Sequence, residues 1–188
     1  TFVPSAQTAA KSRARVQRGR GAGELEDVKA LVVGNPLPLP EGVASLSYAR
    51  EEAEEVTALL DAQVAFTGRV MALYETAATL GTVTDALPDQ RVLHFACHGI
   101  FDTDEPLNSG LVMVGGEMLT LRAVRDSTTR VKERLVILSA CQTGITDFHE
   151  LPDEVIGLPA GFLAAGAAGV IGSLWPVDDR STALLMTD

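Results

Sequence analysis

Two short motifs in this chain end an apolar run on a side chain that can do chemistry. Residues 93–99 read LHFACHG and carry His98, and residues 138–144 read LSACQTG and carry Cys141. A cysteine nucleophile needs a base within hydrogen-bond reach and donors for the developing oxyanion. The pair of motifs therefore predicts a cysteine protease.

Both reactive side chains fall where predicted strands end. In open parallel sheets reactive groups collect at the carboxyl ends of the strands, so we expect His98 as the base and Cys141 as the nucleophile at one edge. Gly99 leaves the backbone open to close substrate approach. The N–H groups of Gly99 and Cys141 are predicted to bind the oxyanion. A neighbouring imidazolium would favour the reactive thiolate.

Other residues compete for these roles. A cysteine at the end of an apolar strand is often a small core residue, which is the alternative for Cys141. No comparable glycine-bounded turn directly follows Cys97, and His94, inside the strand, is interpreted as structural. His149, in the loop after Cys141, is the rival base. A zinc site from the cysteines and histidines matches no common ligand spacing, so we predict neither a metal nor a cofactor.

The composition narrows the class of protein. The chain has 188 residues, 46% of them hydrophobic, a formal net charge of −10 and only two cysteines. This acidic balance disfavours nucleic acid and anionic membranes as partners. Two cysteines are too few for a secreted disulfide scaffold, and no signal peptide or membrane-spanning run is evident. We therefore expect a cytoplasmic protein.

Short apolar runs alternate with helical patterns along the chain. Strands are predicted at residues 29–33, 64–66, 91–97, 111–114, 134–139 and 169–173, and helices at 48–60, 71–87, 157–165 and from about 180. Ser47 is expected to cap the helix at 48–60, and its acidic residues, Glu51, Glu52, Glu54 and Glu55, to face solvent. This alternation predicts an α/β fold, a mostly parallel sheet flanked by helices on both faces.

The chain divides into a short N-terminal segment and one domain. Residues 1–28 are the N-terminal segment, in which 11–27 carry basic residues and glycines with almost no large apolar side chains, and this composition predicts a mobile linker. A nucleic-acid-binding arm is the alternative, but no aromatic residues are interleaved with the basic ones. Residues 29–188 are predicted to form the domain, which is expected to be truncated at the C-terminus inside a final helix.

Four motifs, in order, resemble the CHAT domain, the caspase-like domain found with tetratricopeptide repeats. They are His98-Gly99, residues 138–144, the pair Gly157-Leu158 before residues 162–167 (FLAAGA), and residues 173–179 (SLWPVDD). The resemblance implies a caspase-hemoglobinase fold over residues 29–188. It also implies a dyad of His98 and Cys141 that hydrolyses peptide bonds through an acyl-enzyme.

The resemblance suggests a specificity element as well. CHAT domains are similar to separases, whose substrate-binding acidic residue lies in a tryptophan-containing segment like residues 175–179 (WPVDD). Asp179, with Asp178, is therefore expected to line an acidic S1 pocket. A carboxylate pairs well with a guanidinium or ammonium group, which favours a basic P1 residue. The alternative is that Asp179 caps the helix beginning near Arg180.

Together these features predict a cytoplasmic, bacterial-type cysteine endopeptidase in signalling or defence. Its expected partners are a protein or peptide substrate and a tetratricopeptide-repeat or sensor domain that regulates it, with neither nucleic acid nor membrane. A basic P1 preference would make Arg18 or Arg20 a self-cleavage site. The alternative function is a catalytically silent interaction module with the same fold, and the presence of both dyad residues favours the enzyme.

Overall fold

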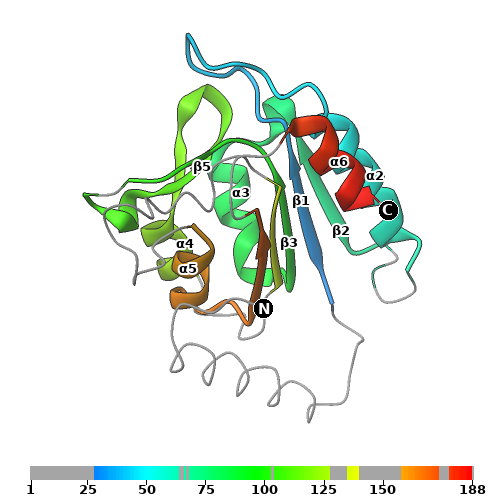
Figure 1. Cartoon of the computed structure of the whole chain (residues 1–188). Coiled ribbons are helices and arrows are strands. Elements are labelled where there is room, and N and C mark those ends of the chain that lie inside the picture. The colour runs from blue at the N-terminus through cyan, green and yellow to red at the C-terminus, as the bar shows by residue number, and fades with distance from the viewer. Residues whose placement is uncertain are drawn as a thin grey trace.

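The fold is an α/β sandwich built around a parallel sheet. The computed structural model describes residues 28–63, 66, 68–102, 104–127, 135–139, 158–173 and 178–187. Within these ranges the chain forms a five-stranded sheet and a separate three-stranded sheet (Figure 1). The N-terminal segment predicted as a linker lies outside the described residues, except for Val28.

The large sheet has the strand order β2-β1-β3-β7-β8. Its strands are β1 (Ala30–Gly34), β2 (Val70–Tyr74), β3 (Val92–Ala96), β7 (Leu135–Ser139) and β8 (Gly169–Gly172), and every pair is parallel. The interior strand β1, between β2 and β3, is buried along its whole length. Helices on both faces bury such strands, which explains their nearly continuous apolar sequences.

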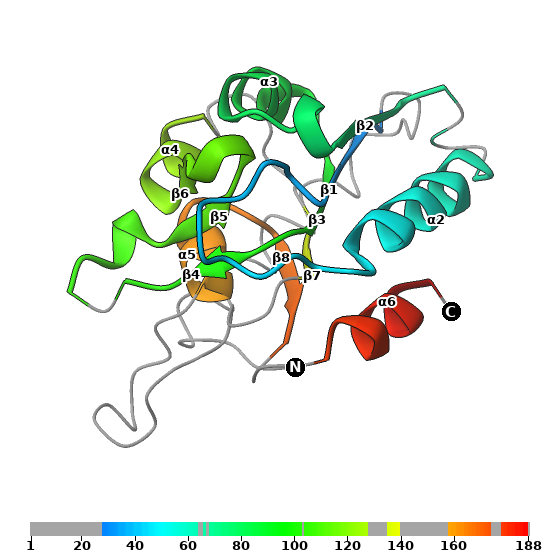
Figure 2. The same ribbon diagram turned by 90° about the horizontal axis from the view of Figure 1, so that it is seen from above.

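One face of the large sheet is covered by α3 (Leu80–Ala86), α4 (Leu121–Ser127) and α5 (Leu158–Ala164). Figure 2 shows these three helices on the opposite side of the strands from α2 (Ala49–Asp61) and α6 (Asp179–Thr187). The main apolar core lies on the α3–α5 side. Its strand residues alternate along the chain, as the two-residue period of a strand requires: Leu31, Val33, Leu93, Phe95, Val136 and Leu138.

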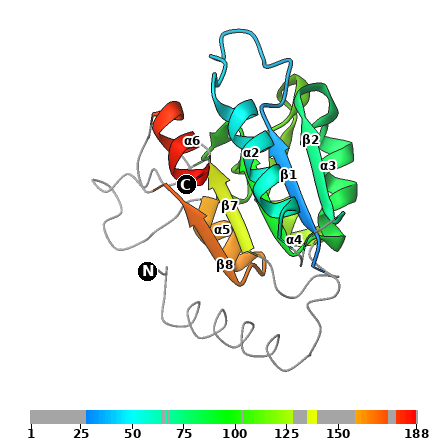
Figure 3. The ribbon, with the colours of Figure 1, turned by 90° about the vertical axis from the view of Figure 1, so that its right-hand side faces the viewer.

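The other face of the sheet carries a smaller core under α2. Val32 and Ala96 from the strands pack there with Ala49, Ala53 and Val56 of the helix. Figure 3 looks onto this face, with α2 and α6 in front of the sheet. The helix α2 therefore packs over β1 and β3, and Ala96, the last residue of β3, is part of this contact.

The small sheet follows β3 directly and was not predicted as a sheet. Its antiparallel strands are β4 (Gly99–Ile100), β5 (Gly110–Val112) and β6 (Met118–Thr120). Single turns of 3-10 helix connect several elements: Glu75–Ala77, Leu87–Asp89, Pro106–Asn108 and Val114–Gly116. Because β4 begins at Gly99, the small sheet anchors the backbone that follows His98.

The predicted α/β class and mostly parallel sheet are confirmed, but the helix predicted at residues 71–87 is present only at Leu80–Ala86. The second strand lies at Val70–Tyr74, and Phe66 is in a turn. The helix begins only at Leu80, where the Thr79 side chain accepts a hydrogen bond from the Thr82 N–H at 3.1 Å. The apolar run at Val70–Tyr74 is too short to distinguish the two-residue period of a strand from the 3.6-residue period of a helix, so the sequence alone did not decide between them.

Candidate active site

The carboxyl ends of the parallel strands meet at one edge of the large sheet. In the pairing of β3 with β7, Ala96 lies opposite Ser139. His98 follows Ala96 by two residues, and Cys141 follows Ser139 by two residues. The expected convergence of the two strand ends is therefore present in the fold.

His98 is held by a loop that precedes α2. Its Nε2 lies 2.8 Å from the carbonyl oxygen of Ala44, and the ring is partly exposed. A carbonyl oxygen only accepts, so the hydrogen bond requires the proton on Nε2. Nδ1 is then the ring nitrogen that can take a proton from a nucleophile, and the Ala44 contact fixes the tautomer and the orientation of the ring.

The backbone at Gly99 is fixed by the small sheet. The Val112 N–H donates to the His98 carbonyl at 2.8 Å, and Gly99 lies opposite Leu111. This pattern makes Gly99 and Leu111 a pair that exchanges no hydrogen bonds across the ladder. The Gly99 N–H is consequently left out of the ladder with β5, as an oxyanion donor requires.

The other half of the predicted dyad lies outside the described residues. Cys141 falls in the range 140–157, as does the rival base His149, and 174–177 of the tryptophan-containing segment are likewise not described. The catalytic role of Cys141 and the oxyanion role of its N–H stay predictions. The last described residue before it is Ser139, at the end of β7.

Cys97 is not suited to be the nucleophile. It is fully buried in the main core, on the face away from α2. Burial raises the pKa of its thiol far above the ordinary value of 9.0, and the charge of Glu52 adds to this rise. The thiolate is the reactive form, so a thiol held neutral in the core is inert.

The two adjacent aspartates make different contacts. Asp178 is exposed and caps α6, because its Oδ1 accepts hydrogen bonds from the N–H and the hydroxyl of Ser181, both at 3.0 Å. These bonds lower the pKa of Asp178. Asp179, the first residue of α6, instead accepts from the backbone N–H of Tyr48 at 2.8 Å. The cap predicted as the alternative for Asp179 is thus made by Asp178.

The Asp179 contact also replaces the predicted cap of α2. Tyr48 precedes the first residue of this helix, and its own side chain makes no cap hydrogen bond. We expected Ser47 to supply the cap, but the acceptor comes from a carboxylate 131 residues away in sequence. A carboxylate is favourable there because the N-terminal end of a helix carries a partial positive charge.

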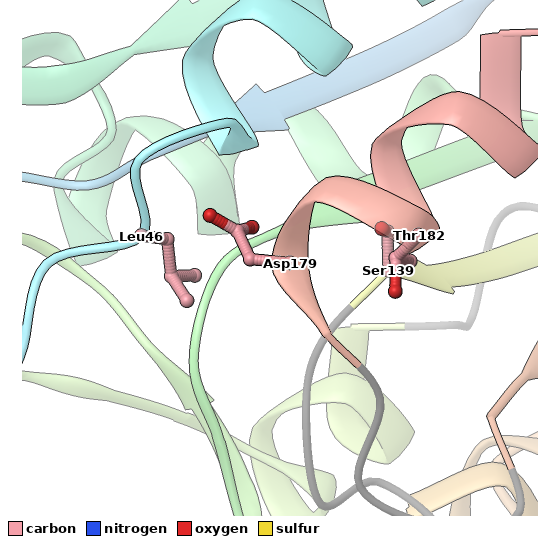
Figure 4. Close-up of a pocket in the computed structure, with 4 residues that line it drawn as sticks. All are labelled: Leu46, Ser139, Asp179 and Thr182. Carbon is pink, nitrogen blue, oxygen red and sulfur yellow. The ribbon is translucent and has the colours of Figure 1, made fainter.

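Asp179 lines a small pocket at the carboxyl edge of the sheet. The pocket is lined by Leu46, Ser139, Asp179 and Thr182, drawn in Figure 4. These residues come from the loop before α2, the end of β7 and the first turns of α6. The pocket therefore places the candidate specificity residue beside the strand that leads to Cys141.

A buried polar network, missed in the sequence, lies between α2 and the sheet. Glu52 is 2% exposed, and its Oε1 lies 2.8 Å from His94 Nε2. Its Oε2 accepts a hydrogen bond from the Ser139 hydroxyl, also at 2.8 Å. We expected Glu52 to face solvent, and that was wrong. The structural role predicted for His94 is consistent with its place in this network.

Among the residues that the structure describes, no group of three or more His, Cys, Asp or Glu side chains could hold a metal ion. Within the same ranges, none of the helices has the length and apolar character needed to cross a bilayer.

A model of the CHAT domain family matches residues 1–188, which is the whole chain. The chain belongs to the CHAT domain family. The resemblance noted in the sequence motifs is thereby confirmed. No curated protein matches the chain.

Among solved structures, this CHAT domain is similar to the crystal structure of the Arg-specific cysteine proteinase gingipain R. The TM-score is 0.53 at 13% sequence identity, and the match covers 93% of this chain and 40% of that one. The chain thus spans about two fifths of the length of that proteinase. At this identity the likeness shows the fold, so the CHAT domain has a caspase-like protease fold.

The structure brings several predicted site residues of the CHAT domain to one edge. His98, Gly99 and Asp179 all lie near the carboxyl ends of β3 and β7. The carboxylate of Asp178 instead caps α6.

The sequence did not mark Glu52 as a buried residue, because it stands in a run of charged residues. Its spacing of three from Ala49 and four from Val56 was the available signal, since those positions share one helix face.

Proposed function

We propose that this CHAT domain is a cysteine endopeptidase with His98 as base and Cys141 as nucleophile. The observation that carries the proposal is the register of β3 with β7, in which Ala96 lies opposite Ser139. Neighbouring strands lie about 4.8 Å apart. Two residues of chain reach at most about 7 Å, so covalent geometry keeps both side chains near the same edge.

The chemistry is acyl transfer in two stages. His98 Nδ1 takes the thiol proton, and the Cys141 sulfur attacks the carbonyl carbon of the scissile bond. The N–H groups of Gly99 and Cys141 stabilise the oxyanion of the tetrahedral intermediate. As the intermediate collapses, the C–N bond breaks and the imidazolium protonates the leaving amine. Water, deprotonated by His98, then hydrolyses the thioester, releasing a carboxylic acid and the thiol.

The residues that line the small pocket beside Ser139, and not its size, support selection of a basic P1 residue. Arginine and lysine carry an aliphatic stem and a charged head, which suit a wall with an apolar and an acidic residue. Leu46 and Asp179 are such a pair. The similar proteinase, gingipain R, is described as Arg-specific. In this proposal Asp179 pairs with the P1 cation, and Asp178 acts by capping α6.

A peptide library tests the proposal. The parent protein should cleave peptides after arginine or lysine, whereas Cys141→Ala should not. His98→Ala should lower the rate by about 10²–10⁴-fold, because it removes the acid-base group. Cys97→Ala is the matched cysteine control and should cleave at the parent rate, since Cys97 is buried in the core.

Two results would contradict parts of this proposal. If the parent cleaves no peptide faster than Cys141→Ala, the CHAT domain is the silent interaction module instead. Cleavage restricted to acidic or apolar P1 residues would remove only the role of Asp179. The alkylation rate of Cys141 gives a second readout, because an activated thiol reacts faster than a free one at neutral pH.

A further inference from the structure

The buried carboxylate of Glu52 joins two strands that carry the candidate dyad. Its two oxygens contact His94, in the middle of β3, and Ser139, at the end of β7. All three residues are at most 7% exposed. His98 lies four residues beyond His94 on one strand, and Cys141 lies two residues beyond Ser139 on the other. No step of the proposed mechanism uses this network.

Stability alone explains the network poorly. Taking a carboxylate out of water is costly, and replacing a buried ionic or polar group and its partners by apolar residues is often neutral or stabilising. The benefit of such a network is geometric, because each hydrogen bond needs a defined distance and angle. Glu52 therefore fixes where the end of β7 lies relative to β3.

We propose that Glu52 is a positioning residue that acts through Ser139 to place Cys141 within reach of His98. The inference rests on the proposed function in that it takes Cys141 as the nucleophile. The Ser139 hydroxyl donates a hydrogen bond to Glu52, and Ser139 also lines the pocket at the edge of the sheet. Glu52 therefore contacts a residue that is itself part of the candidate site.

The segment that carries Glu52 also holds the other parts of the site. Residues 44–52 begin with the Ala44 carbonyl, which orients His98, and include the Tyr48 N–H, which binds Asp179. One continuous stretch thus contacts the base, the specificity residue and the nucleophile-bearing strand. The loop before α2 and the first turn of this helix set their relative positions, and a displacement of this stretch would misalign all three together.

Alkylation of Cys141 by iodoacetamide tests this inference without any substrate. The protein has two cysteines, and Cys97 is buried and inert, so a Cys97→Ala background makes the signal specific. Ser139→Ala removes the bond to Glu52, and we expect alkylation at neutral pH and kcat of peptide cleavage to fall about 10-fold, with little change in KM. A displacement of about 1 Å at a reacting group costs this much or more.

Rescue and matched controls separate positioning from a general loss of structure. Ser139→Thr keeps the hydroxyl and should restore most of the alkylation rate. Thr57→Val, on the same helix, removes hydrogen bonds to Ala53 and Tyr74 and should lower stability without slowing alkylation. Glu51→Gln changes an exposed charge one residue from Glu52 and should have no effect.

A double-mutant cycle tests whether Glu52 acts through Ser139. Glu52→Gln should slow alkylation a few-fold alone and have no further effect in the Ser139→Ala background, because coupled residues are not additive. The isosteric change also keeps the test open if Ser139→Ala fails to fold. Additive effects, or Ser139→Ala reacting like the parent, would overturn the inference.

Failure of the proposed function would look different. In that case the parent cleaves nothing, yet a Cys141 that alkylates faster than a free thiol and slows in Ser139→Ala still supports the positioning role. A parent thiol that reacts no faster than a free one would overturn both.

Discussion

The two faces of the large sheet bury different kinds of side chain. The face under α3, α4 and α5 is a continuous apolar core in which Phe95 packs against Phe162, with ring centroids 6.4 Å apart. The face under α2 has a smaller apolar core, and it also buries a carboxylate, an imidazole and a hydroxyl that bond to one another. The same strands form both faces, so the side chains that point to each face, together with the helices above them, make the difference.

Apolar packing is non-directional and stabilises roughly in proportion to the area buried. Hydrogen bonds add less net free energy but fix distances and angles. The comparison therefore assigns stability mainly to the face with Phe162 and alignment of the site mainly to the face with Glu52. Substitutions on the two faces should separate these properties.

The largest loss of stability is expected on the apolar face. Phe162→Ala removes a side chain that is 1% exposed and leaves a cavity against Phe95, so we expect a loss of about 3–5 kcal/mol in the free energy of unfolding. Urea unfolding measures it. Leu59→Ala, at a half-exposed position on α2, is the control and should stay within about 0.5 kcal/mol of the parent. A loss below 1 kcal/mol for Phe162→Ala would contradict the assignment.

Turning the polar face apolar should have the opposite signature. In the triple variant Glu52→Leu, His94→Leu, Ser139→Ala, no partner is left unpaired, so the free energy of unfolding should change by less than about 2 kcal/mol or rise. Alkylation of Cys141 should fall about 10-fold, because the end of β7 is no longer held. A stable variant that alkylates at the parent rate would show that the network does not align the site.

The buried thiol of Cys97, in the main apolar core, predicts a dependence of stability on pH. Burial raises the pKa of Cys97 above its ordinary value of 9.0, so the unfolded chain loses this proton at lower pH than the folded protein. The associated stability is complete below about pH 9 and decreases above it, by up to about 1.4 kcal/mol per pH unit. The difference between parent and Cys97→Ala in urea unfolding from pH 8 to 10.5 isolates this effect. A difference that stays constant over that range would contradict it.

The smallest effect is expected at the contact between α6 and α2. Asp179→Asn keeps an oxygen to accept from Tyr48 but removes the charge, so stability should change by less than about 1 kcal/mol. The ratio of kcat/KM for arginine over glutamine at P1 should fall about fivefold, as expected when a charge-assisted hydrogen bond becomes neutral. Asp178→Asn should leave this ratio unchanged, and an equal effect of both variants would argue against a role of Asp179 in P1 selection.

The fold was largely predictable because local patterns and the sheet agree. The β-branched and leucine-rich run at 134–139 predicts a buried strand, and it forms β7 at Leu135–Ser139 with three of five residues buried. The same logic predicted β3 and β8. It failed at residues 71–74, where the run was too short to distinguish the period of a strand from that of a helix.

Of the candidate site, the sequence predicted the reactive side chains and Asp179, and their catalytic and binding roles stay predictions. The types and spacing of His98 and Cys141 carry chemical meaning in sequence, whereas the groups that orient them do not. The Ala44 carbonyl is a backbone atom, so no residue type marks it. Glu52 looked like its exposed neighbours, and the signals to the contrary were its place on the helix face of Ala49 and Val56 and the need of a buried His94 for a partner.

The contacts that assemble the site join parts of the chain that are far apart. Ala44 and His98 are 54 residues apart, Glu52 and Ser139 are 87 apart, and Tyr48 and Asp179 are 131 apart. Closing loops of this length costs chain entropy, so each contact depends on the assembled sheet that brings its two partners together. A partly folded chain therefore lacks an aligned site, and the proposed proteolysis would require the sheet and its helices to be assembled first.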